Sequence, residues 1–271
     1  MRKIGRSEFE LLKNKNIEEG KLPRGYLSPS SVGKLQNCGE QFRRYYVEGE
    51  DGGPPSPKMQ LGTDVHQMVE DFCTLFFDNC KDQGVDPLEV TASNRRELFP
   101  SLQEVLEHNS CEDEQAQNIY ALWHKEMSES LYVPLSSENT YYCAVGDTPI
   151  MAKVDLVLLD LATNTTSVVD LKVGTKKRDA KESTQLSIYS VATGYSNVGY
   201  WQMIPPKIRV GAKSVLSTTE VDNRFLDFVE MTIRAAAQAI EAGIFLPAQP
   251  GDWMCSEKYC GHFDKCRGGE K

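Results

Sequence analysis

The sequence has no apolar run long enough to span a lipid bilayer, and its beginning, MRKIGRSEFELLKNKN, lacks the apolar core of a signal peptide. It contains no internal repeat and no phosphate-binding loop of the GxxxxGK[ST] type. Basic residues are outnumbered, because 30 Lys and Arg face 39 Asp and Glu, for a formal net charge of −9. These absences predict a soluble intracellular protein of the cytoplasm, or of the host cytoplasm if it is viral, whose surface is not basic throughout.

Histidine is also scarce, at 4 residues, whereas cysteine is plentiful, at 8. An intracellular chain of this length is not expected to use its cysteines as a disulfide framework. Those with apolar neighbours are predicted to be small core residues: Cys73, Cys80, Cys111 and Cys143. Three others crowd into the C-terminal tail with the spacing C-x4-C-x5-C: Cys255, Cys260 and Cys266. Apolar packing does not explain such crowding, so the tail is predicted to bind a metal.

A tetrahedral metal site or a cubane cluster needs a fourth ligand besides these three thiolates. His262, inside the tail, would complete a zinc site of the Cys3His kind. Cys38, in the segment NCGEQFRRYY, is the competing ligand, and it would join the two ends of the chain. Thiolate sets suit both zinc and iron–sulfur clusters, so the residues alone leave the metal open.

Apolar residues at helical spacing predict a helical N-terminal part over about 28–135. A first helix is expected to start at Ser28 or Ser30 and to run to the Gly- and Pro-rich loop 48–57. A second helix covers MQLGTDVHQMVEDFCTLFF. Residues 81–135 carry weaker helical signals, which are typical of an insertion.

From about residue 140 the apolar spacing changes to that of a sheet. Three strands, TYYCAVGD, PIMAKVDLVLLD and TSVVDLKVG, are separated by turns short enough for antiparallel hairpins. A helix in ESTQLSIYSVATGY, two strands in VGYWQMIPP and IRVGAKSVL, and an amphipathic helix ending at Gly243 follow. The prediction is one α/β domain over 1–271, with its core over about 140–242 and a cysteine-rich tail over 243–271.

Two charges interrupt the third of these strands, in the stretch VVDLKVGTKK. Asp170 and Lys172 lie two residues apart, so their side chains leave the same face of the strand. Burying an unpaired charge costs several kcal/mol, roughly, and the two therefore need compensation. An ion pair at a sheet edge is the simple explanation. The basic residues that follow form either a solvated loop or a binding patch: Lys176, Lys177, Arg178 and Lys181.

A second carboxylate, Asp155, interrupts the preceding strand. If the two strands pair as a hairpin, Asp155 and Asp170 approach each other near one end of the sheet. Two adjacent carboxylates repel, and one protonates unless a cation lies between them. Mg²⁺ or Mn²⁺ resolves the conflict, because hard divalent cations prefer oxygen ligands. Lys172 would then help to activate a water that attacks a phosphodiester.

Further polar residues occur in a fixed order around this pair. Upstream, GTDVH places His66 on the second predicted helix, and downstream QLSIY places Gln185 and Tyr189 on one face of the next helix. Together with VDLVLLD and DLK, these motifs resemble the RecB-like branch of the PD-(D/E)xK nuclease superfamily, in particular its members that carry an iron–sulfur cluster. That family shows GxxxH, an aspartate at the end of one strand, D/ExK on the next and QxxxY on the following helix.

The resemblance implies a restriction-endonuclease-like core, a mixed central sheet flanked by helices, and it implies roles for these residues. His66, Asp155 and Asp170 are assigned as ligands of the catalytic metal, Lys172 serves the attacking water, and Gln185 and Tyr189 position DNA. The family's layout also implies a 4Fe-4S cluster that joins the C-terminus to the N-terminal helix, held by Cys38, Cys255, Cys260 and Cys266. The first two tail cysteines are farther apart here than is common in the family.

The function that the resemblance implies is a metal-dependent deoxyribonuclease, an exonuclease on single strands or DNA ends in repair, recombination or phage DNA metabolism. A non-catalytic DNA-binding or assembly module of the same fold, docking to a helicase or recombination partner, is the alternative. An enzyme of this fold that acts on RNA, or as a site-specific endonuclease, is a third. Because the chain has no phosphate loop, any unwinding must come from another protein.

Overall fold

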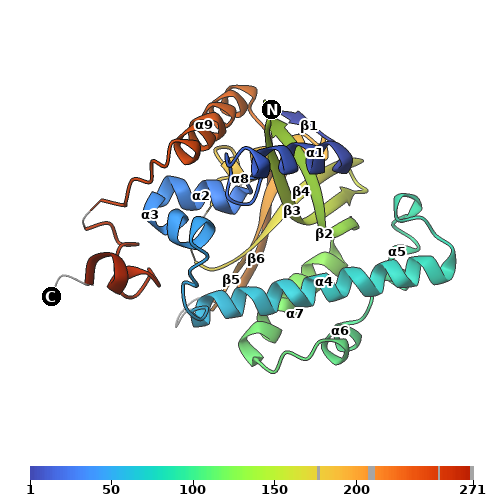
Figure 1. The fold of residues 1–271 in the computed structure, drawn as a ribbon. Helices are drawn as coiled ribbons and strands as arrows, with labels where there is room; N and C mark the ends of the chain where they lie inside the picture. The colour runs from blue at the N-terminus through green and yellow to red at the C-terminus, as the bar shows by residue number, and fades with distance from the viewer. Residues whose placement is uncertain (176–177, 207–210, 250, 269–271) are drawn as a thin grey trace.

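The computed structural model, which describes residues 1–175, 178–206, 211–249 and 251–268, is organised by one mixed sheet (Figure 1). Its strands lie in the order β1-β2-β3-β4-β5-β6. Neighbours are antiparallel except β4 and β5, which are parallel and are connected through helix α8, so the expected meander of three strands is confirmed. The strands are β1 (Arg2–Lys3), β2 (Tyr132–Val145), β3 (Thr148–Asp160), β4 (Thr165–Val173), β5 (Asn197–Ile204) and β6 (Lys213–Glu220).

Helices cover both faces of the sheet, which confirms the expected α/β architecture (Figure 1). One face carries α4 (Pro57–Gln83), the 3₁₀ turn η2 (Pro87–Glu89), α5 (Arg95–Leu98), α6 (Leu102–His108) and α7 (Glu114–Glu129). The other carries α2 (Pro29–Asn37), α8 (Thr184–Thr193) and α9 (Asn223–Glu241).

Alternation along β4 decides which way its charged residues point. Val169 and Leu171 pack in the core under α4 and α7, whereas Val168 packs in the core under α8 and α9. Asp170 alternates with Val169 and Leu171 and therefore lies on the α8 face. The strand pattern thus directs a carboxylate toward the first turn of α8.

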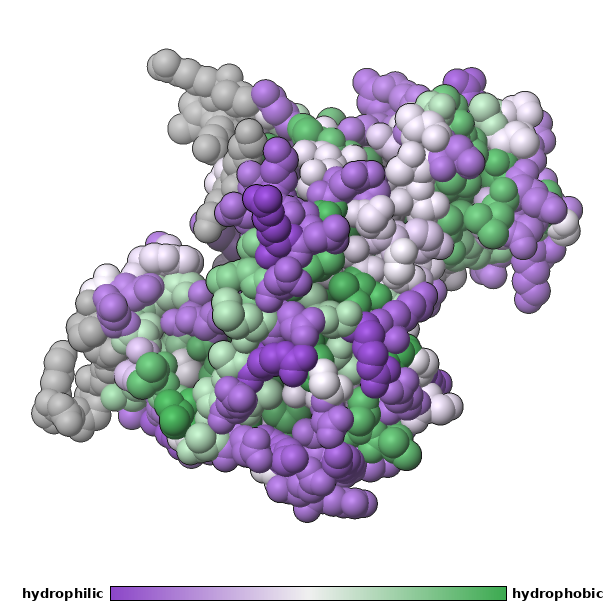
Figure 2. Space-filling view, turned by 90° about the horizontal axis from the view of Figure 1, so that it is seen from above, coloured by the Kyte–Doolittle hydropathy of each residue, from purple (hydrophilic) through white to green (hydrophobic). Residues whose placement is uncertain are grey.

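The surface has a different character from these two cores. Figure 2 shows the face seen from above Figure 1, where apolar residues lie in small patches among hydrophilic ones. None of the helices within the described ranges combines the length and the apolarity that crossing a bilayer requires.

The segment ahead of residue 28 adds two elements that the apolar pattern did not indicate. Strand β1 pairs with β2 through Arg2↔Ala144, and α1 (Arg6–Glu18) packs on β2 and β3. The ring of Phe9 in α1 lies 4.4 Å, centroid to centroid, from the ring of Tyr142. A strand of two residues carries no periodic signal, and its existence depends entirely on its partner strand.

The single helix expected from Ser28 to the loop 48–57 is wrong. Ser28 does cap α2, because its hydroxyl accepts from the N–H of Ser31, but Cys38 is extended (φ −162°, ψ 106°). A short α3 (Gly39–Phe42) and a π-helical turn η1 (Arg43–Val47) follow. The break lets the C-terminal segment approach: Gly39 donates to the carbonyl of Leu246 at 2.7 Å, and a Cβ on Gly39 would lie only 2.6 Å from the Leu246 nitrogen.

Strand β2 is longer than expected, and it begins at Tyr132, inside the range 81–135 that was expected to be helical. Its first half reads YVPLSSEN, in which a proline and a polar run hide the strand pattern. Strand β6, expected over IRVGAKSVL (208–216), begins at Lys213. Residues 208–210 of that stretch lie outside the described residues. The scattered cysteines are core residues at Cys73, Cys80 and Cys143, but Cys111 is only half-buried.

Candidate metal and sulfur sites

Asp170 is buried in the middle of the sheet. Strand β4 lies between β3 and β5, so the explanation as an ion pair at a sheet edge is wrong. The Asp170 side chain is 1% exposed, and its Oδ2 forms an ion pair with the ammonium of Lys172 on the same strand. No donor in the described part of the chain makes a well-directed hydrogen bond to that oxygen. The pair is therefore real, but one carboxylate oxygen retains capacity for a further ligand.

Asp155 lies beside Asp170, as the hairpin predicts. Leu156 pairs with Val169 across β3 and β4, and the two aspartates are the next residues on these strands. The backbone N–H of Leu171 donates to Asp155 Oδ2 at 2.8 Å. Burial raises the pKa of both carboxyls, and the negative charge of Asp155 raises the pKa of Asp170 further. Two carboxyls held together in this way favour a bound cation.

His66 reaches the same place from α4. Its Nδ1 lies 3.7 Å from Asp155 Oδ2. Burial, and then the positive charge of Lys172, lower the pKa of His66. The imidazole is therefore neutral near pH 7, which is the form that binds metals.

Glu138, on β2, is a site residue that the sequence analysis missed. One donor atom each from His66, Glu138 and Asp155 lie within 4.8 Å of one another. Glu138 lies opposite Asp155, between the pairs Ser137↔Leu156 and Asn139↔Val154, and its φ of 53° is unusual for a residue with a side chain. Lys153 contacts its carboxylate at 2.5 Å. The signal available in the sequence was a lone Glu in a polar run, which indicates nothing by itself.

Gln185 and Tyr189 complete the group from α8. The side-chain amide of Gln185 donates to Asp170 Oδ1 at 2.6 Å and to the hydroxyl of Tyr189 at 2.8 Å. Ser183 caps α8 by accepting from the N–H of Leu186, which fixes the first turn that carries Gln185. Gln185 therefore orients the Asp170 carboxylate, and burial raises the pKa of Tyr189 so that its hydroxyl stays protonated.

The donor set suits a hard divalent cation. The carboxylates of Glu138 and Asp155, on adjacent strands, converge with the neutral imidazole of His66. Asp170 lies beside Asp155, and its Oδ2 is buried without a well-directed donor among the described residues. Oxygen ligands with one imidazole fit Mg²⁺ or Mn²⁺. Of the three residues predicted as ligands, His66 and Asp155 belong to this group of donor atoms, and its third member is Glu138 in place of Asp170.

The basic residues after Lys172 are only partly described. Lys176 and Lys177 lie outside the described residues. The guanidinium of Arg178 lies 5.9 Å from the ring centroid of Tyr200, and Lys181 is exposed.

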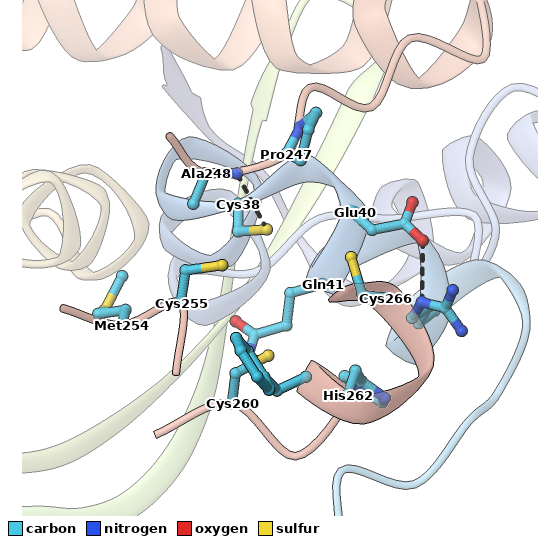
Figure 3. Close-up of a pocket in the computed structure, with 12 residues that line it drawn as sticks. Cys38, Glu40, Gln41, Pro247, Ala248, Met254, Cys255, Cys260, His262 and Cys266 are labelled. Atoms are coloured by element: carbon cyan, nitrogen blue, oxygen red, sulfur yellow. Dashed lines mark hydrogen bonds and ion pairs between the residues drawn. The ribbon is translucent and has the colours of Figure 1, made fainter. Parts of the chain in front are cut away.

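The four cysteines predicted to hold a cluster line one pocket, at the place where the C-terminal tail meets α3 (Figure 3). Figure 3 shows the sulfur atoms of Cys38, Cys255, Cys260 and Cys266 facing a common space, which we call the sulfur pocket. The backbone N–H of Ala248 donates to Cys38 Sγ at 3.3 Å, and Gln41 Nε2 lies 4.0 Å from Cys260 Sγ. Residues more than 200 positions apart in the chain therefore present thiols to one another.

His262 is poorly oriented as the fourth ligand. Its Nδ1 lies 3.5 Å from Glu50 Oε2, and its Nε2 lies 3.7 Å from the position that a Cβ on Gly52 would take. Both ring nitrogens thus face the loop 50–52, and in Figure 3 the ring points away from the four sulfurs. The orientation favours Cys38 over His262.

The tail is docked by contacts that do not require a metal. Glu50 accepts ion pairs from Arg44 at 3.3 Å and from Lys265 at 3.2 Å. Gly261 lies against the backbone of Gly52 so closely that a Cβ would be 1.6 Å from the Gly52 carbonyl oxygen. The turn η3 (Asp264–Gly268) ends the described tail.

Comparisons with known proteins give one family. A family model described as "PD-(D/E)XK nuclease superfamily" matches residues 26–267. A search of curated proteins found no match. Among solved structures, "Putative exonuclease" from Eubacterium rectale is similar at 14% identity and a TM-score of 0.49, over 94% of this chain and 92% of that one. The structure of SSO0001 is similar at 11% identity and a TM-score of 0.41, over 96% and 95%.

The raised pKa values of Asp155 and Asp170 predict how pH acts on the metal-free protein. From the ordinary aspartate pKa of about 3.9 up to the raised values, the folded state binds more protons than the unfolded state, so these groups lower the free energy of unfolding as pH rises. The substitution Asp170→Asn removes one of the two titrating carboxyls and its charge repulsion with Asp155. We expect the free energy of unfolding of Asp170→Asn, relative to that of wild type, to rise by up to about 1.4 kcal/mol for each pH unit over this range.

Urea unfolding in chelator, at steps from pH 4 to pH 7, measures this difference. Asp227→Asn, which changes an exposed carboxyl on α9, is the matched control and should keep a constant offset from wild type. A constant offset for Asp170→Asn as well would contradict the prediction.

Proposed function

Because this chain belongs to the PD-(D/E)XK nuclease superfamily, we propose that it is a divalent-metal-dependent DNA nuclease of the RecB-like branch, an exonuclease on DNA ends or single strands. The observation that carries the proposal is the convergence of His66, Glu138, Asp155 and Asp170 beside Lys172. The ion pair of Lys172 with the buried Asp170 is weak evidence of a stabilising role, because apolar residues often replace such pairs without loss of stability.

Three strands and one helix contribute the residues that would hold the cation: His66, Glu138, Asp155 and Asp170. A divalent cation bound there would polarise the phosphate and lower the pKa of the attacking water. Gln185 keeps Asp170 in a fixed orientation by its hydrogen bond at 2.6 Å. A carboxylate that is already oriented lowers the entropy cost of reaching the reactive geometry.

Lys172 has the chemistry of a residue that acts on the attacking water. Its side chain is one quarter exposed, so the ammonium can contact substrate while its ion pair with Asp170 holds it in place. It can donate to the attacking water and stabilise the negative charge that grows on the phosphate oxygens during hydrolysis. The proton leaves the attacking water toward the surrounding carboxylates or solvent, and the bond that breaks joins phosphorus to the leaving oxygen of the sugar.

For the sulfur pocket we propose a 4Fe-4S cluster held by Cys38, Cys255, Cys260 and Cys266. The common orientation of the four thiols supports this ligand set, and the outward orientation of His262 argues against the Cys3His zinc site. For such a nuclease we propose a role in repair, recombination or phage DNA metabolism beside a separate helicase or recombination protein.

Replacing Lys172 by Ala should lower the rate of DNA cleavage roughly 10²- to 10³-fold, since the loss of one donor that stabilises the charge developing in the transition state costs that much. End-labelled single-stranded and duplex DNA, incubated with Mg²⁺ or Mn²⁺, measure the rate, and a circular single strand separates exonuclease from endonuclease action. Lys125→Ala, an exposed lysine on α7 on the opposite face of the sheet, is the matched control and should cleave normally.

Normal cleavage by Lys172→Ala would contradict its role. If wild type binds DNA but does not cleave it with either metal, the non-catalytic binding module becomes the better account.

Glu138→Gln should weaken Mn²⁺ binding at least roughly tenfold, because the loss of even an indirect contact to a metal ligand costs that much. Calorimetric titration of the DNA-free protein with Mn²⁺ gives the dissociation constant without any use of activity. Glu220→Gln on β6 removes an equal charge from an exposed position and should leave the constant unchanged. Equal affinities for Glu138→Gln and wild type would exclude Glu138 as a ligand.

Cys260→Ala should remove the broad visible absorption of anaerobically purified protein together with its iron and acid-labile sulfide. His262→Ala should retain both, because its ring faces Glu50 and Gly52. Cys111→Ala, a half-buried cysteine outside the sulfur pocket, serves as the matched control. Stoichiometric zinc in place of iron would overturn the cluster, and loss of metal in His262→Ala would support the Cys3His site.

A further inference from the structure

A groove beside the catalytic residues has no role in the chemistry described above. Its volume is about 330 Å³, at the lower end of the range of small-ligand sites, and we call it the tyrosine groove. Its lining includes Tyr26, Tyr45, Tyr46 and Tyr189, and the serines of the first turn of α2. Gln185, which donates to Asp170, and Lys153, which contacts Glu138, also line it. The groove therefore adjoins the carboxylates of the candidate metal site through Gln185 and Lys153.

The charge of the tyrosine groove is opposite to that of the whole chain. Arg24 and Lys153 line it, and no aspartate or glutamate in the described part of the chain does, although the full sequence has 39 acidic residues. No ion pair among the described residues involves Arg24, and its side chain is exposed. An arginine without a carboxylate partner offers its fork of donors to an anion, and phosphate fits that fork well.

The aromatic residues of the groove are arranged for stacking. The guanidinium carbon of Arg24 lies 4.5 Å from the ring centroid of Tyr46 and 5.6 Å from that of Tyr45. The ammonium of Lys34 lies 4.3 Å from the Tyr45 centroid, and Tyr45 remains 36% exposed. Cations among aromatic rings are the usual means by which proteins hold single strands, because every unpaired base has a face that stacks.

We propose that the tyrosine groove binds the unpaired strand of DNA that adjoins the scissile phosphate, with Arg24 on a backbone phosphate and Tyr45 stacked on a base. The inference rests on the proposed function, since it names the form of DNA that the nuclease accepts. Bases in a duplex are already stacked on one another and cannot use a tyrosine face. A blunt duplex therefore gains nothing from this groove, and substrates with an unpaired strand are preferred.

Binding to fluorescent oligo(dT), measured by anisotropy in chelator so that no cleavage occurs, tests the groove. We expect Tyr45→Ala to bind roughly 5- to 150-fold more weakly, the effect of losing one stacked base, and Tyr45→Phe to bind like wild type. Arg24→Ala should also weaken binding and should flatten its salt dependence, as the loss of a phosphate contact does. Arg224→Ala on α9 removes the same charge from another exposed position and is the matched control.

A blunt hairpin duplex is the second probe, and its affinity should be the same in all these proteins. Unchanged oligo(dT) affinity in both Tyr45→Ala and Arg24→Ala would overturn the proposal, and so would an equal loss for the duplex. Binding is measured without cleavage, so the two proposals can fail separately. If the wild-type protein cleaves no DNA, but Tyr45→Ala and Arg24→Ala still bind oligo(dT) more weakly than it does, the nuclease is refuted and the groove is supported.

Photocrosslinking of the wild-type protein avoids any effect of a variant on folding. An oligo(dT) that carries 5-iododeoxyuridine should crosslink to Tyr45 or Tyr46, identified by mass spectrometry of the peptides. Crosslinks confined to other segments would place the strand elsewhere and overturn the proposal.

Discussion

The burial of Asp170 in the central strand is the constraint on which the rest of the site depends. A carboxylate that is 1% exposed must be compensated, and each neighbour supplies part of the compensation. Lys172 contributes a charge from the same strand face, and Gln185 contributes a donor from the first turn of α8. Asp155 then adds an unfavourable negative charge beside it, which only a cation can offset fully. The site is thus built to be least stable when it is empty, as functional sites often are.

The sequence allowed prediction of the parts of the site that depend on short-range spacing. Asp170 and Lys172 share a strand face because they are two apart, and Gln185 and Tyr189 share a helix face because they are four apart. The prediction that Asp155 lies beside Asp170 followed from the short turn between β3 and β4, which makes the two strands a hairpin. Each of these inferences needs only the geometry of one element or one hairpin.

The parts that could not be predicted depend on contacts between distant segments. Glu138 joins the site because β2 pairs with β3 in a register that places it opposite Asp155, and because its backbone takes a φ of 53°. The helix break at Cys38 accommodates the C-terminal segment at Leu246, more than 200 residues away. Neither feature leaves a periodic signal, since the apolar spacing from α2 to η1 is that of one continuous helix.

The short segment from Cys38 to Val47 contributes residues both to the sulfur pocket and to the tyrosine groove. Its π-helical turn η1 places Arg44 in the lining of the sulfur pocket and the next residue, Tyr45, in the lining of the groove. The ammonium of Lys34 lies over the ring of Tyr45, and burial lowers the pKa of Lys34. Within the described ranges, however, the sulfur pocket shares no residue with the group of His66, Glu138 and Asp155. A cluster in the sulfur pocket would therefore act on the position of the DNA strand through this segment, and the hydrolysis itself would depend on the residues around Asp170.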